Sequence, residues 1–546
     1  MQLSYDESHV RAVAELFDAA YYLATNQDVR EHGIDPLTHF LTTGWREGRN
    51  PSCDFDVAYY QQTNPDVVAA GLNPLVHYAL SGAREGRLPR RPLDSVRRHL
   101  DNARAPSARV DAWEAAADLS PALSRAALAR SLASAVASRD ALVVSISHDD
   151  YDRNFGGVQK AIRDEQIAAE RMNWGYLHLS PAAPLPMLAE PTLAGSFRFG
   201  LRLGSDWLGV ATATDLVAAL TEFRSDGVPI FLVLHHLMGH APEVLLELAA
   251  VTAEPTIVWV HDYFTLCPSY NLLRNDVRFC GAPSAMSAAC GICAYGPDRA
   301  EHLRRVRAFF EAVRPVILAP SEAALDLWRR RSELAHREAH VQPLARLVLA
   351  PEQLNTEPMR ALRIAHLGAR NLPKGWPVFE QLALRFAKDP DYTFYQLGVL
   401  HGAPISCCIR NVNVQVSREQ PEAMIETIAE HRIDVVVSWS LWPETFCFAA
   451  HEALAGGSFV LARAAAGNVA HTIKKIAPEQ GHVLEDEGLL FELFEEGRLR
   501  NMLRTARCRR GVLIAESGSA PWLRRFWRGG GICPARSYRQ ERAYSE

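Results

Sequence analysis

Lysine is scarce in this sequence. Only five of its 58 basic residues are lysines: Lys160, Lys374, Lys388, Lys474 and Lys475. Arginine therefore carries nearly all of the positive charge, and each lysine marks a place where a compact ammonium group stands instead of a planar guanidinium. The net charge of -5 excludes a protein that binds nucleic acid through bulk basicity, so we expect no nucleic-acid partner.

Long hydrophobic runs are also missing. The longest apolar stretches, near residues 229–234 and 435–438, have the length of a strand and fall short of the ~20 residues that span a bilayer. The first residues carry Asp and Glu where a signal peptide has basic and then apolar residues. Ten cysteines in 546 residues are too few for a disulfide framework. These absences lead us to expect a cytoplasmic protein.

The composition that is present is that of a globular protein. Hydrophobic residues make up 48% of the chain and charged residues 22%, which excludes collagenous, coiled-coil and wholly disordered proteins. At ~150 residues per domain, the chain is long enough for three or four domains.

A duplication organises the first part of the chain. Residues 17–51 and 55–89 align without a gap and are identical at 19 of 35 positions. Each copy predicts a short helix with two tyrosines, an Asn-x-Asp-Val turn, a second helix with one histidine, and a Gly-rich exit. Such helices cannot bury their apolar faces alone, so we expect the copies to stack. His39 and His77 are expected to be packed helix residues, with metal binding as the alternative.

Short apolar runs separated by helical patterns follow from residue 141. Apolar strands that alternate with amphipathic helices are typical of parallel sheets covered on both faces. A gap near residues 340–360 divides the runs into two series, which predicts an α/β fold with two Rossmann-like, doubly wound domains that face a cleft. Ligands bind such sheets beyond the carboxyl ends of the strands.

The expected strands are 142–146, 176–179, 230–234, 256–260 and 316–319 in the first series, and 363–367, 393–397, 412–416, 434–438 and 459–462 in the second. The expected division of the chain is a small all-α repeat module (1–95), a linker with helices (96–140), an N-terminal Rossmann-like domain (141–345), a C-terminal one (360–490), and a return helix with a basic tail (491–546).

The most informative motif, WSLWPETFCFAAHEALAGG, runs from Trp439 to Gly457. It predicts the end of a strand, a turn at Pro443 and a helix that begins near Thr445. The backbone N–H groups of such a helix start are suited to a diphosphate, and an acid beside them can accept hydrogen bonds from sugar hydroxyls. The alternative is an ordinary helix whose first acid favours the helix dipole.

Glu444 and Glu452 of this motif are separated by seven residues, and PETFCFAAHEALAGG resembles the Glu-x7-Glu signature of retaining, nucleotide-sugar-dependent glycosyltransferases of family 4, which have the GT-B fold. The resemblance implies that Glu444 contacts the transferred sugar and Glu452 the ribose of the nucleotide. It also implies that Thr445 and Phe446 bind the donor. Family members often have Gly where this chain has Cys447.

A second motif, IAHLGARNLPKGWPVF, runs from Ile364 to Phe379 and predicts a strand, a loop and a helix. It resembles the loop of the same family that holds the donor diphosphate. The resemblance implies that Arg370 and Lys374, beside Gly368, neutralise the leaving group. In a chain that uses arginine almost everywhere, Lys374 also indicates that a point charge is needed there. A lysine on a solvated helix face is the alternative.

The loop SISHDDYDRNFGGVQK follows the first strand of the N-terminal Rossmann-like domain. Gly156 and Gly157 in it allow a ligand to approach the backbone closely, and they resemble the family's Gly-Gly loop, which lines the cleft opposite the donor. Asp150 and Asp152 form an Asp-x-Asp triplet, which holds a metal ion in the other glycosyltransferase fold. The two-domain pattern favours the metal-independent fold, so we expect no catalytic metal.

His261 ends another strand, in VWVHDYFTLCPSY, which resembles a His-Asp-aromatic segment of a subset of these enzymes. The resemblance implies that His261 lies near the sugar as a hydrogen-bond partner or proton carrier. A histidine that caps the strand end is the alternative, and His235 and His236 compete for the same role.

Four cysteines follow with the spacing C-x12-C-x9-C-x2-C; they are Cys267, Cys280, Cys290 and Cys293. In a reducing compartment such a set can form a closed structural zinc site with four thiolates. Packed free thiols are the alternative. A closed tetrahedral site leaves no position for a substrate, so no catalytic role is expected.

Together the motifs predict a glycosyltransferase that moves a hexosyl-type sugar, with retention, from a nucleotide diphosphate sugar to a glycan or lipid-linked acceptor. No catalytic cofactor is expected. The resemblance covers residues 141–500 and implies a role in bacterial surface polysaccharide synthesis, with Glu444, His261 and Lys374 as catalytic residues. The alternatives are a nucleotide-sugar epimerase or hydrolase of the same fold, and a non-catalytic scaffold whose repeats dock a protein partner.

The C-terminal stretch 498–542 combines many arginines with Trp522, Phe526 and Trp527. We expect a final helix that returns to the N-terminal Rossmann-like domain, followed by a basic tail. The alternative is a peripheral contact with an anionic membrane, at the inner face of the cell membrane.

Overall fold

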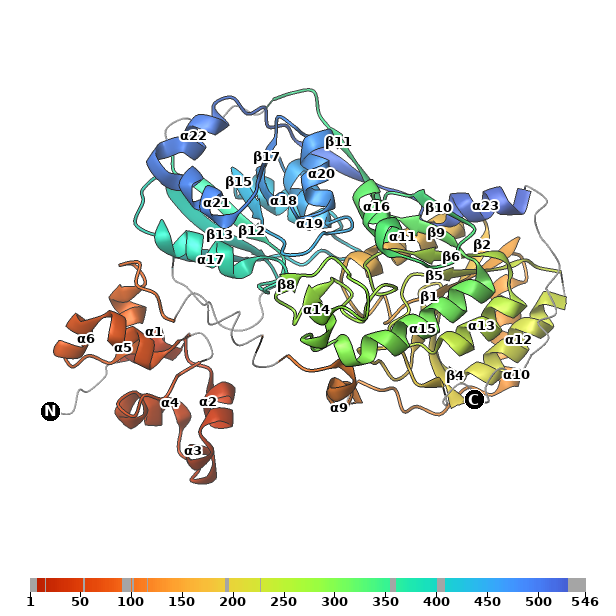
Figure 1. Cartoon of the computed structure of the whole chain (residues 1–546), viewed down its shortest axis with the longest axis horizontal. Helices are drawn as coiled ribbons and strands as arrows, with labels where there is room; N and C mark the ends of the chain where they lie inside the picture. The colour runs from red at the N-terminus through yellow and green to blue at the C-terminus, as the bar shows by residue number, and fades with distance from the viewer. Residues whose placement is uncertain are drawn as a thin grey trace.

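The computed structural model describes residues 7–14, 16–52, 55–90, 100, 103–114, 116–191, 196–225, 227–353, 360–399 and 408–528. Two α/β bodies lie against each other, and a small helical module lies beside them (Figure 1). Each body is built on a largely parallel sheet. The predicted fold class, two Rossmann-like domains preceded by a helical repeat module, is confirmed.

The N-terminal domain has an eight-stranded sheet in the order β10-β9-β6-β5-β1-β2-β3-β4. The strands from β10 to β2 in this order run parallel, and β3 and β4 form an antiparallel hairpin at one edge. The central strands are apolar without alternation because helices cover both faces; every residue of β5 is buried. The strands are β1 (Ala141–Ile146), β2 (Trp174–Pro181), β3 (Arg198–Leu203), β4 (Asp206–Thr212), β5 (Ile230–Leu234), β6 (Ala253–Trp259), β9 (Val316–Ala319) and β10 (Glu338–Val341).

The helices of this domain are α10 (Arg125–Val136), α11 (Gly157–Arg171), α12 (Ala213–Ser225), α13 (Pro242–Val251), α15 (Gly296–Val313) and α16 (Glu322–Arg331). The long connection after β6 carries the small hairpin β7 (Leu273–Arg274) and β8 (Arg278–Phe279) and the turn of helix α14 (Ala288–Gly291). The 3-10 turn η3 (Pro106–Arg109) and α9 (Asp111–Glu114) precede the domain.

The C-terminal domain has a six-stranded, fully parallel sheet in the order β14-β13-β12-β15-β16-β17. The order reverses between β12 and β15, which is where doubly wound sheets bind ligands. Its strands are β12 (Leu362–Leu367), β13 (Tyr392–Gly398), β14 (Ile409–Asn413), β15 (Val435–Ser438), β16 (Phe459–Arg463) and β17 (Gly481–Leu484). Its helices are α17 (Trp376–Arg385), α18 (Ala423–Glu430), α19 (Phe448–Ala455), α20 (Asn468–Lys475), α21 (Glu487–Phe494) and α22 (Arg498–Leu503), with the 3-10 turn η5 (Glu495–Gly497).

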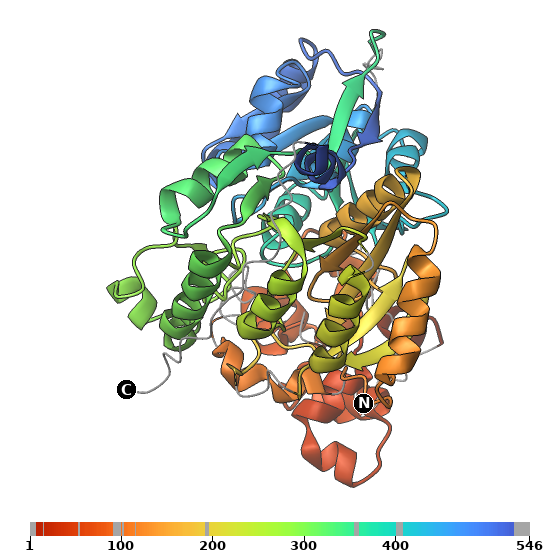
Figure 2. The ribbon, with the colours of Figure 1, turned by 90° about the vertical axis from the view of Figure 1, so that its right-hand side faces the viewer.

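The chain crosses between the domains twice, and β11 (Ala345–Leu349) and β18 (Gly511–Ala515) pair antiparallel at the crossing. The final described helix, α23 (Ala520–Arg528), then lies on the N-terminal domain; it is the dark blue helix seen end-on near the middle of Figure 2. Trp522, Phe526 and Trp527 pack against the core of that domain. The aromatic side chains on which the membrane alternative rested are therefore used in packing. Residues 529–546 lie outside the described part of the chain.

No described helix is long and apolar enough to cross a membrane.

The repeat module contains α1 (Glu7–Ala14) and two similar units. The first unit consists of α2 (Ala19–Thr25), α3 (Gln27–Glu31), α4 (Pro36–His39) and the π-helical turn η1 (Phe40–Gly44), and the second of α5 (Val57–Thr63), α6 (Pro65–Ala69), α7 (Pro74–His77) and η2 (Tyr78–Gly82). Both units contribute to one apolar core. The Asn-x-Asp-Val segments form short helices, where the sequence predicted a turn.

The histidines of the repeats are packing residues. The hydroxyl group of Tyr22 lies 3.0 Å from Nδ1 of His39, and that of Tyr60 lies 2.9 Å from Nδ1 of His77. The repeated glycine of each unit faces the same hydroxyl: a Cβ at Gly82 would lie 2.0 Å from the Tyr60 oxygen. The duplicated Tyr, His and Gly therefore form one packing unit in each copy.

All ten strands predicted from the sequence overlap strands of the structure, although 412–416 is shifted against β14 (Ile409–Asn413). The hairpin β3–β4 and the strands β10, β11, β17 and β18 were not predicted. They are edge or crossing strands, several of them partly exposed, whose polar residues weaken the hydrophobic pattern.

Replacing Gly82 by Ala should destabilise the second repeat, because the new methyl group collides with the Tyr60 hydroxyl. Tyr60→Phe removes the hydrogen bond to His77, at a cost of about 1 kcal/mol, but it also removes the oxygen atom that collides with the methyl group and leaves tight contacts of 3.2 and 3.3 Å. The double variant should therefore be more stable than Gly82→Ala alone, by roughly 1–2 kcal/mol. Hydrogen exchange over residues 57–82 of the full-length protein measures this, and simple additivity of the two effects would contradict it.

Candidate functional site

Two neighbouring cavities lie in the cleft between the domains. The first, which we call the inter-domain cavity, has a volume of about 820 Å³ and is lined by residues of both domains. The second, the first-domain cavity, has a volume of about 1130 Å³ and is lined mostly by residues of the N-terminal domain. The cavities share a wall made of Phe155, Gly157, Val158, Asp262 and Tyr270.

The C-terminal domain contributes two loops to the inter-domain cavity, one after β12 and one after β15. Both loops leave the carboxyl ends of parallel strands, where the order of the sheet reverses. They are joined by hydrogen bonds to the Pro373 carbonyl, from the backbone N–H of Leu441 (2.9 Å) and from the Ser440 hydroxyl (3.2 Å). The two motifs recognised in the sequence therefore form one continuous surface.

An ion pair joins the same two loops at the cavity. The Nζ atom of Lys374 lies 2.7 Å from Oε1 of Glu444, which also accepts a hydrogen bond from the Ser440 hydroxyl at 3.0 Å. Glu444 is buried, whereas the Lys374 side chain is 39% exposed. Burial opposes a charge on Lys374, but the attraction of Glu444 outweighs it and raises the pKa of the ammonium group above its ordinary value. The lysine is therefore a permanent cation at the cavity wall.

Gly375, directly after this lysine, allows the two loops to touch. Its φ of +79° lies in the left-handed region, and a Cβ there would lie 1.9 Å from the carbonyl oxygen of Trp439. Any side chain at this position would push the loops apart and break the contact between Lys374 and Glu444. Gly368 at the start of the loop also has a left-handed φ, of +89°, but its surroundings are open.

The helix of the Glu-x7-Glu motif begins later than the sequence predicted. It is α19 (Phe448–Ala455), and its N-cap is Cys447 rather than a residue near Thr445. Cys447 has φ = 68° and ψ = 80°, a conformation that favours glycine and stops the helix from extending toward Glu444. Position 447, where members of the resembled family often have Gly, thus differs in residue type but keeps a backbone conformation that a glycine adopts easily.

Glu452 lies one turn into α19 and lines the inter-domain cavity. Burial raises the pKa of its carboxyl group to about 7, although the positive charge of Lys160 opposes the shift. Lys160 comes from α11 of the other domain and also lines the cavity, with its Nζ 5.4 Å from the ring centre of Phe448. No described residue forms an ion pair with Glu452, and a buried acid in that position is unfavourable unless a ligand donates hydrogen bonds to it.

Gly156 and Gly157 also line the inter-domain cavity, at the start of α11. The preceding Asp-x-Asp triplet is engaged elsewhere. Asp150 makes two 2.8 Å contacts with the guanidinium group of Arg202, which also lies 3.1 Å from Asp152. These carboxylates are therefore neutralised by one buried arginine.

His261 lies at the end of β6 and lines the inter-domain cavity. Its backbone carbonyl accepts a 2.5 Å hydrogen bond from the Thr445 hydroxyl, which crosses from the other domain. Its ring is fully buried from bulk water and stacks on Trp259, with 4.9 Å between ring centres and 3° between the planes. Burial, together with the neighbouring imidazoles of His235 and His236, holds the pKa of His261 well below its usual value, so the ring is neutral.

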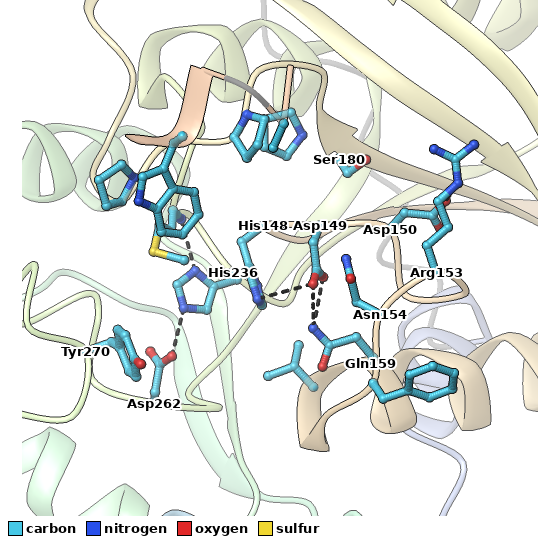
Figure 3. A pocket seen from close by; sticks show the side chains of 18 of the residues that line it. His148, Asp149, Asp150, Arg153, Asn154, Gln159, Ser180, His236, Asp262 and Tyr270 are labelled. Carbon is cyan, nitrogen blue, oxygen red and sulfur yellow. Dashed lines mark hydrogen bonds and ion pairs between the residues drawn. The ribbon is translucent and has the colours of Figure 1, made fainter. Parts of the chain in front are cut away.

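The first-domain cavity has a polar floor (Figure 3). Nε2 of His236 lies 2.7 Å from Oδ2 of Asp262, and the backbone N–H of Met238 donates to the other ring nitrogen of His236 at 3.0 Å. Beside it, Asp149 accepts two hydrogen bonds from the Gln159 amide, at 2.8 and 2.9 Å. Aromatic residues complete the lining; they are Trp113, Phe155, Trp207, Tyr270 and Tyr295.

Most of the site residues expected from the sequence meet in the inter-domain cavity. Those that line it are Gly156, Gly157, His261, Gly368, Lys374, Glu444, Thr445, Phe446 and Glu452. Arg370 is absent from the described lining residues, and its role stays a prediction. Of the competing histidines, His236 lines the first-domain cavity and His235 lies behind His261.

The four cysteines after β6 do not form a metal cage in the described part of the chain, where no group of three or more His, Cys, Asp or Glu side chains is arranged to hold a metal ion. All four are free thiols. Cys290 Sγ instead lies 2.8 Å from a guanidinium nitrogen of Arg299, and burial raises the pKa of Cys267 to about 12. The zinc site stays a prediction from spacing alone.

Lys160 is a cavity residue that the sequence motifs did not single out. A signal for it was present, because it is one of five lysines in the chain and follows the Gly-Gly loop by three positions. Two of the five lysines, Lys160 and Lys374, line the same cavity from opposite domains.

Comparison with solved structures finds matches at low sequence identity. HepE (Alr3699) from Anabaena in complex with UDP is 14% identical, with a TM-score of 0.40, over 70% of this chain and 94% of that one. WaaG, a glycosyltransferase involved in lipopolysaccharide biosynthesis, is 13% identical, with a TM-score of 0.37, over 71% and 96%. The α,α-trehalose 6-phosphate synthase from Burkholderia multivorans is 12% identical, with a TM-score of 0.36, over 68% and 95%. No protein-family model and no curated protein sequence matches this chain.

Glu452→Gln should stabilise the protein at pH 8 but not near pH 4.5. The raised pKa means that the folded state prefers the protonated acid, so the stabilising contribution of Glu452 is complete below its unfolded pKa and is lost as the pH rises through about 7. The advantage of the glutamine variant should therefore grow to about 3 kcal/mol between these pH values. Urea unfolding of both proteins across the range measures it; a difference that is independent of pH would contradict the assignment.

Proposed function

We propose that this chain is a retaining glycosyltransferase that binds a nucleotide diphosphate sugar in the inter-domain cavity. The observation that carries the proposal is the convergence of Lys374, Glu444 and Glu452 on one cavity at the reversal point of a parallel sheet. Its volume of about 820 Å³ lies within the range of about 300–1,000 Å³ that is usual for ligand pockets.

Lys374, Glu444 and Glu452 each contact a different part of the donor. The permanent positive charge of Lys374 stabilises the negative charge that grows on the departing diphosphate. A diphosphate competes with Glu444 for that ammonium group, which leaves the Glu444 carboxylate free to accept hydrogen bonds from the transferred sugar. Glu452 accepts hydrogen bonds from the ribose hydroxyls, which supply the partners that its buried carboxyl group lacks. His261 lies on the opposite wall and contacts the sugar from the N-terminal domain.

The acceptor binds in the first-domain cavity, because that cavity opens onto the same wall as the inter-domain cavity. Its lining combines the faces of Trp113, Trp207 and Tyr270 with the carboxylates of Asp149 and Asp262. Aromatic rings suit the apolar faces of a glycan, and carboxylates can accept hydrogen bonds from its hydroxyl groups. We propose a glycan, free or linked to a lipid, as the acceptor, in the synthesis of a bacterial surface polysaccharide.

Lys374→Ala should lower donor turnover by about two to three orders of magnitude, because it removes the charge that stabilises the leaving diphosphate. Lys388→Ala is the matched control, since Lys388 is an exposed lysine outside both cavities. A thermal-shift screen with a panel of nucleotide diphosphate sugars identifies the donor, and its consumption is then assayed with and without candidate glycans.

Consumption of the donor that depends on a glycan and is lost in Lys374→Ala supports a glycosyltransferase. Consumption at the same rate without any glycan would identify a hydrolase or epimerase instead. Equal turnover by Lys374→Ala and Lys388→Ala would contradict the assigned role of Lys374.

A further inference from the structure

Three side chains, those of His261, His235 and Glu165, are connected by hydrogen bonds that lead from the cavity wall into the protein interior. Nε2 of His261 lies 2.9 Å from Nδ1 of His235, and Nε2 of His235 lies 3.1 Å from Oε1 of Glu165. The side chains of His235 and Glu165 are each only 1% exposed. None of the sequence motifs includes Glu165, which comes from the middle of α11.

Glu165 is held by two further hydrogen bonds. The Tyr176 hydroxyl donates to Oε1 at 3.1 Å, and the backbone N–H of Ser519 donates to Oε2 at 2.6 Å. Burial opposes a charge on the Glu165 carboxyl group, but the hydrogen bonds from Tyr176 and Ser519 stabilise its ionised form. Glu165 is therefore a carboxylate, which accepts hydrogen bonds and donates none.

The positions of the protons along these three side chains depend on that charge and on the number of protons that His235 carries. Since Glu165 only accepts, Nε2 of His235 carries a proton. If that is the only proton on the His235 ring, Nδ1 of His235 is the acceptor, and the proton between the two histidines belongs to Nε2 of His261. The ring of His261 is neutral, so its Nδ1 carries a lone pair. Stacking on Trp259 fixes the plane of this ring.

We propose that His235 carries a proton on Nε2 alone, and that Glu165 and His235 are positioning residues that fix the tautomer of His261, so that His261 offers Nδ1 to the inter-domain cavity as a hydrogen-bond acceptor. Such a histidine selects a ligand group that donates, and a sugar hydroxyl does so. The inference rests on the proposed function for the identity of that ligand, but the tautomer is a property of the protein alone.

Glu165→Gln should reverse the direction of the hydrogen bonds that connect position 165, His235 and His261. The N–H of Ser519 can only donate, so it keeps the amide oxygen of the new glutamine at the Oε2 position. The amide nitrogen then faces His235 and donates to its Nε2. Nδ1 of His235 takes the proton and donates to Nε2 of His261, which leaves Nδ1 of His261 protonated. The substitution preserves the size of the side chain and changes a hydrogen-bond acceptor at the cavity into a donor.

Long-range proton–nitrogen NMR of the full-length protein, labelled with ¹⁵N in histidine, distinguishes the two tautomers. We expect an unprotonated Nδ1 at His261 in the native protein and a protonated one in Glu165→Gln. Tyr176→Phe is the matched control, because it removes another hydrogen bond to Glu165 but leaves the two histidines connected, so its tautomer should be native. A protonated Nδ1 in the native protein would overturn the inference, even if Glu165→Gln failed to fold. An unchanged tautomer in a folded Glu165→Gln would overturn it as well.

Binding of UDP-glucose, or of the nucleotide sugar found in the screen, tests the consequence for the ligand. We expect Glu165→Gln to bind ten- to a hundredfold more weakly than the native protein, and Tyr176→Phe to bind normally. Equal binding by Glu165→Gln despite a reversed tautomer would overturn the role assigned to His261. If the native protein bound no nucleotide sugar, the proposed function would fail, while the NMR experiment would still decide the inference about the tautomer.

Discussion

The ion pair between Lys374 and Glu444 is the contact on which the rest of the cleft depends. It joins the loops after β12 and β15, and it requires the glycine at position 375, since any Cβ there would collide with the Trp439 carbonyl. With the loops held together, α19 begins at Phe448 and directs its first turns toward the cavity. The pair also holds a positive charge at the cavity wall, and Glu444 neutralises this charge when the cavity is empty.

Three buried glutamates line or support the cavity, and they differ in their partners. Glu165 has three hydrogen-bond donors and Glu444 has a cation, whereas no residue of the described ranges pairs with Glu452, and burial raises its pKa to about 7. Interactions within the protein stabilise the carboxylates of Glu165 and Glu444. A ligand that donated hydrogen bonds to Glu452 would stabilise its carboxylate, and binding and folding would then be coupled at this position.

Much of this site was predictable because it lies in continuous motifs. Glu444, Glu452 and Lys374 stand next to strand ends, and strands in a parallel sheet bring their carboxyl ends to one edge. Glu165 was not predictable, because a glutamate inside an amphipathic helix has the pattern of a solvated residue. Only its contacts with His235 and with Ser519, which is 354 positions away in sequence, reveal that it is buried. The late start of α19 was missed for a similar reason, since nothing in the sequence marks Cys447 as left-handed.

Hydrogen bonds beside Glu444 and His261 also fix the position of the two domains relative to each other. Thr445 donates to the His261 carbonyl, Tyr263 donates to the Pro443 carbonyl at 3.2 Å, and Ser321 donates to the Thr445 carbonyl at 2.6 Å. All three bonds cross the cleft at the base of the Glu-x7-Glu loop. Glu165 adds a link to the segment that leads into α23, the helix that returns from the C-terminal domain. A movement of one domain therefore has to move the loop that holds Glu444 or the histidine that faces it. The spacing between the two cavity walls is set by hydrogen bonds beside Glu444 and His261, and a ligand that spanned the walls would act directly on the domain arrangement.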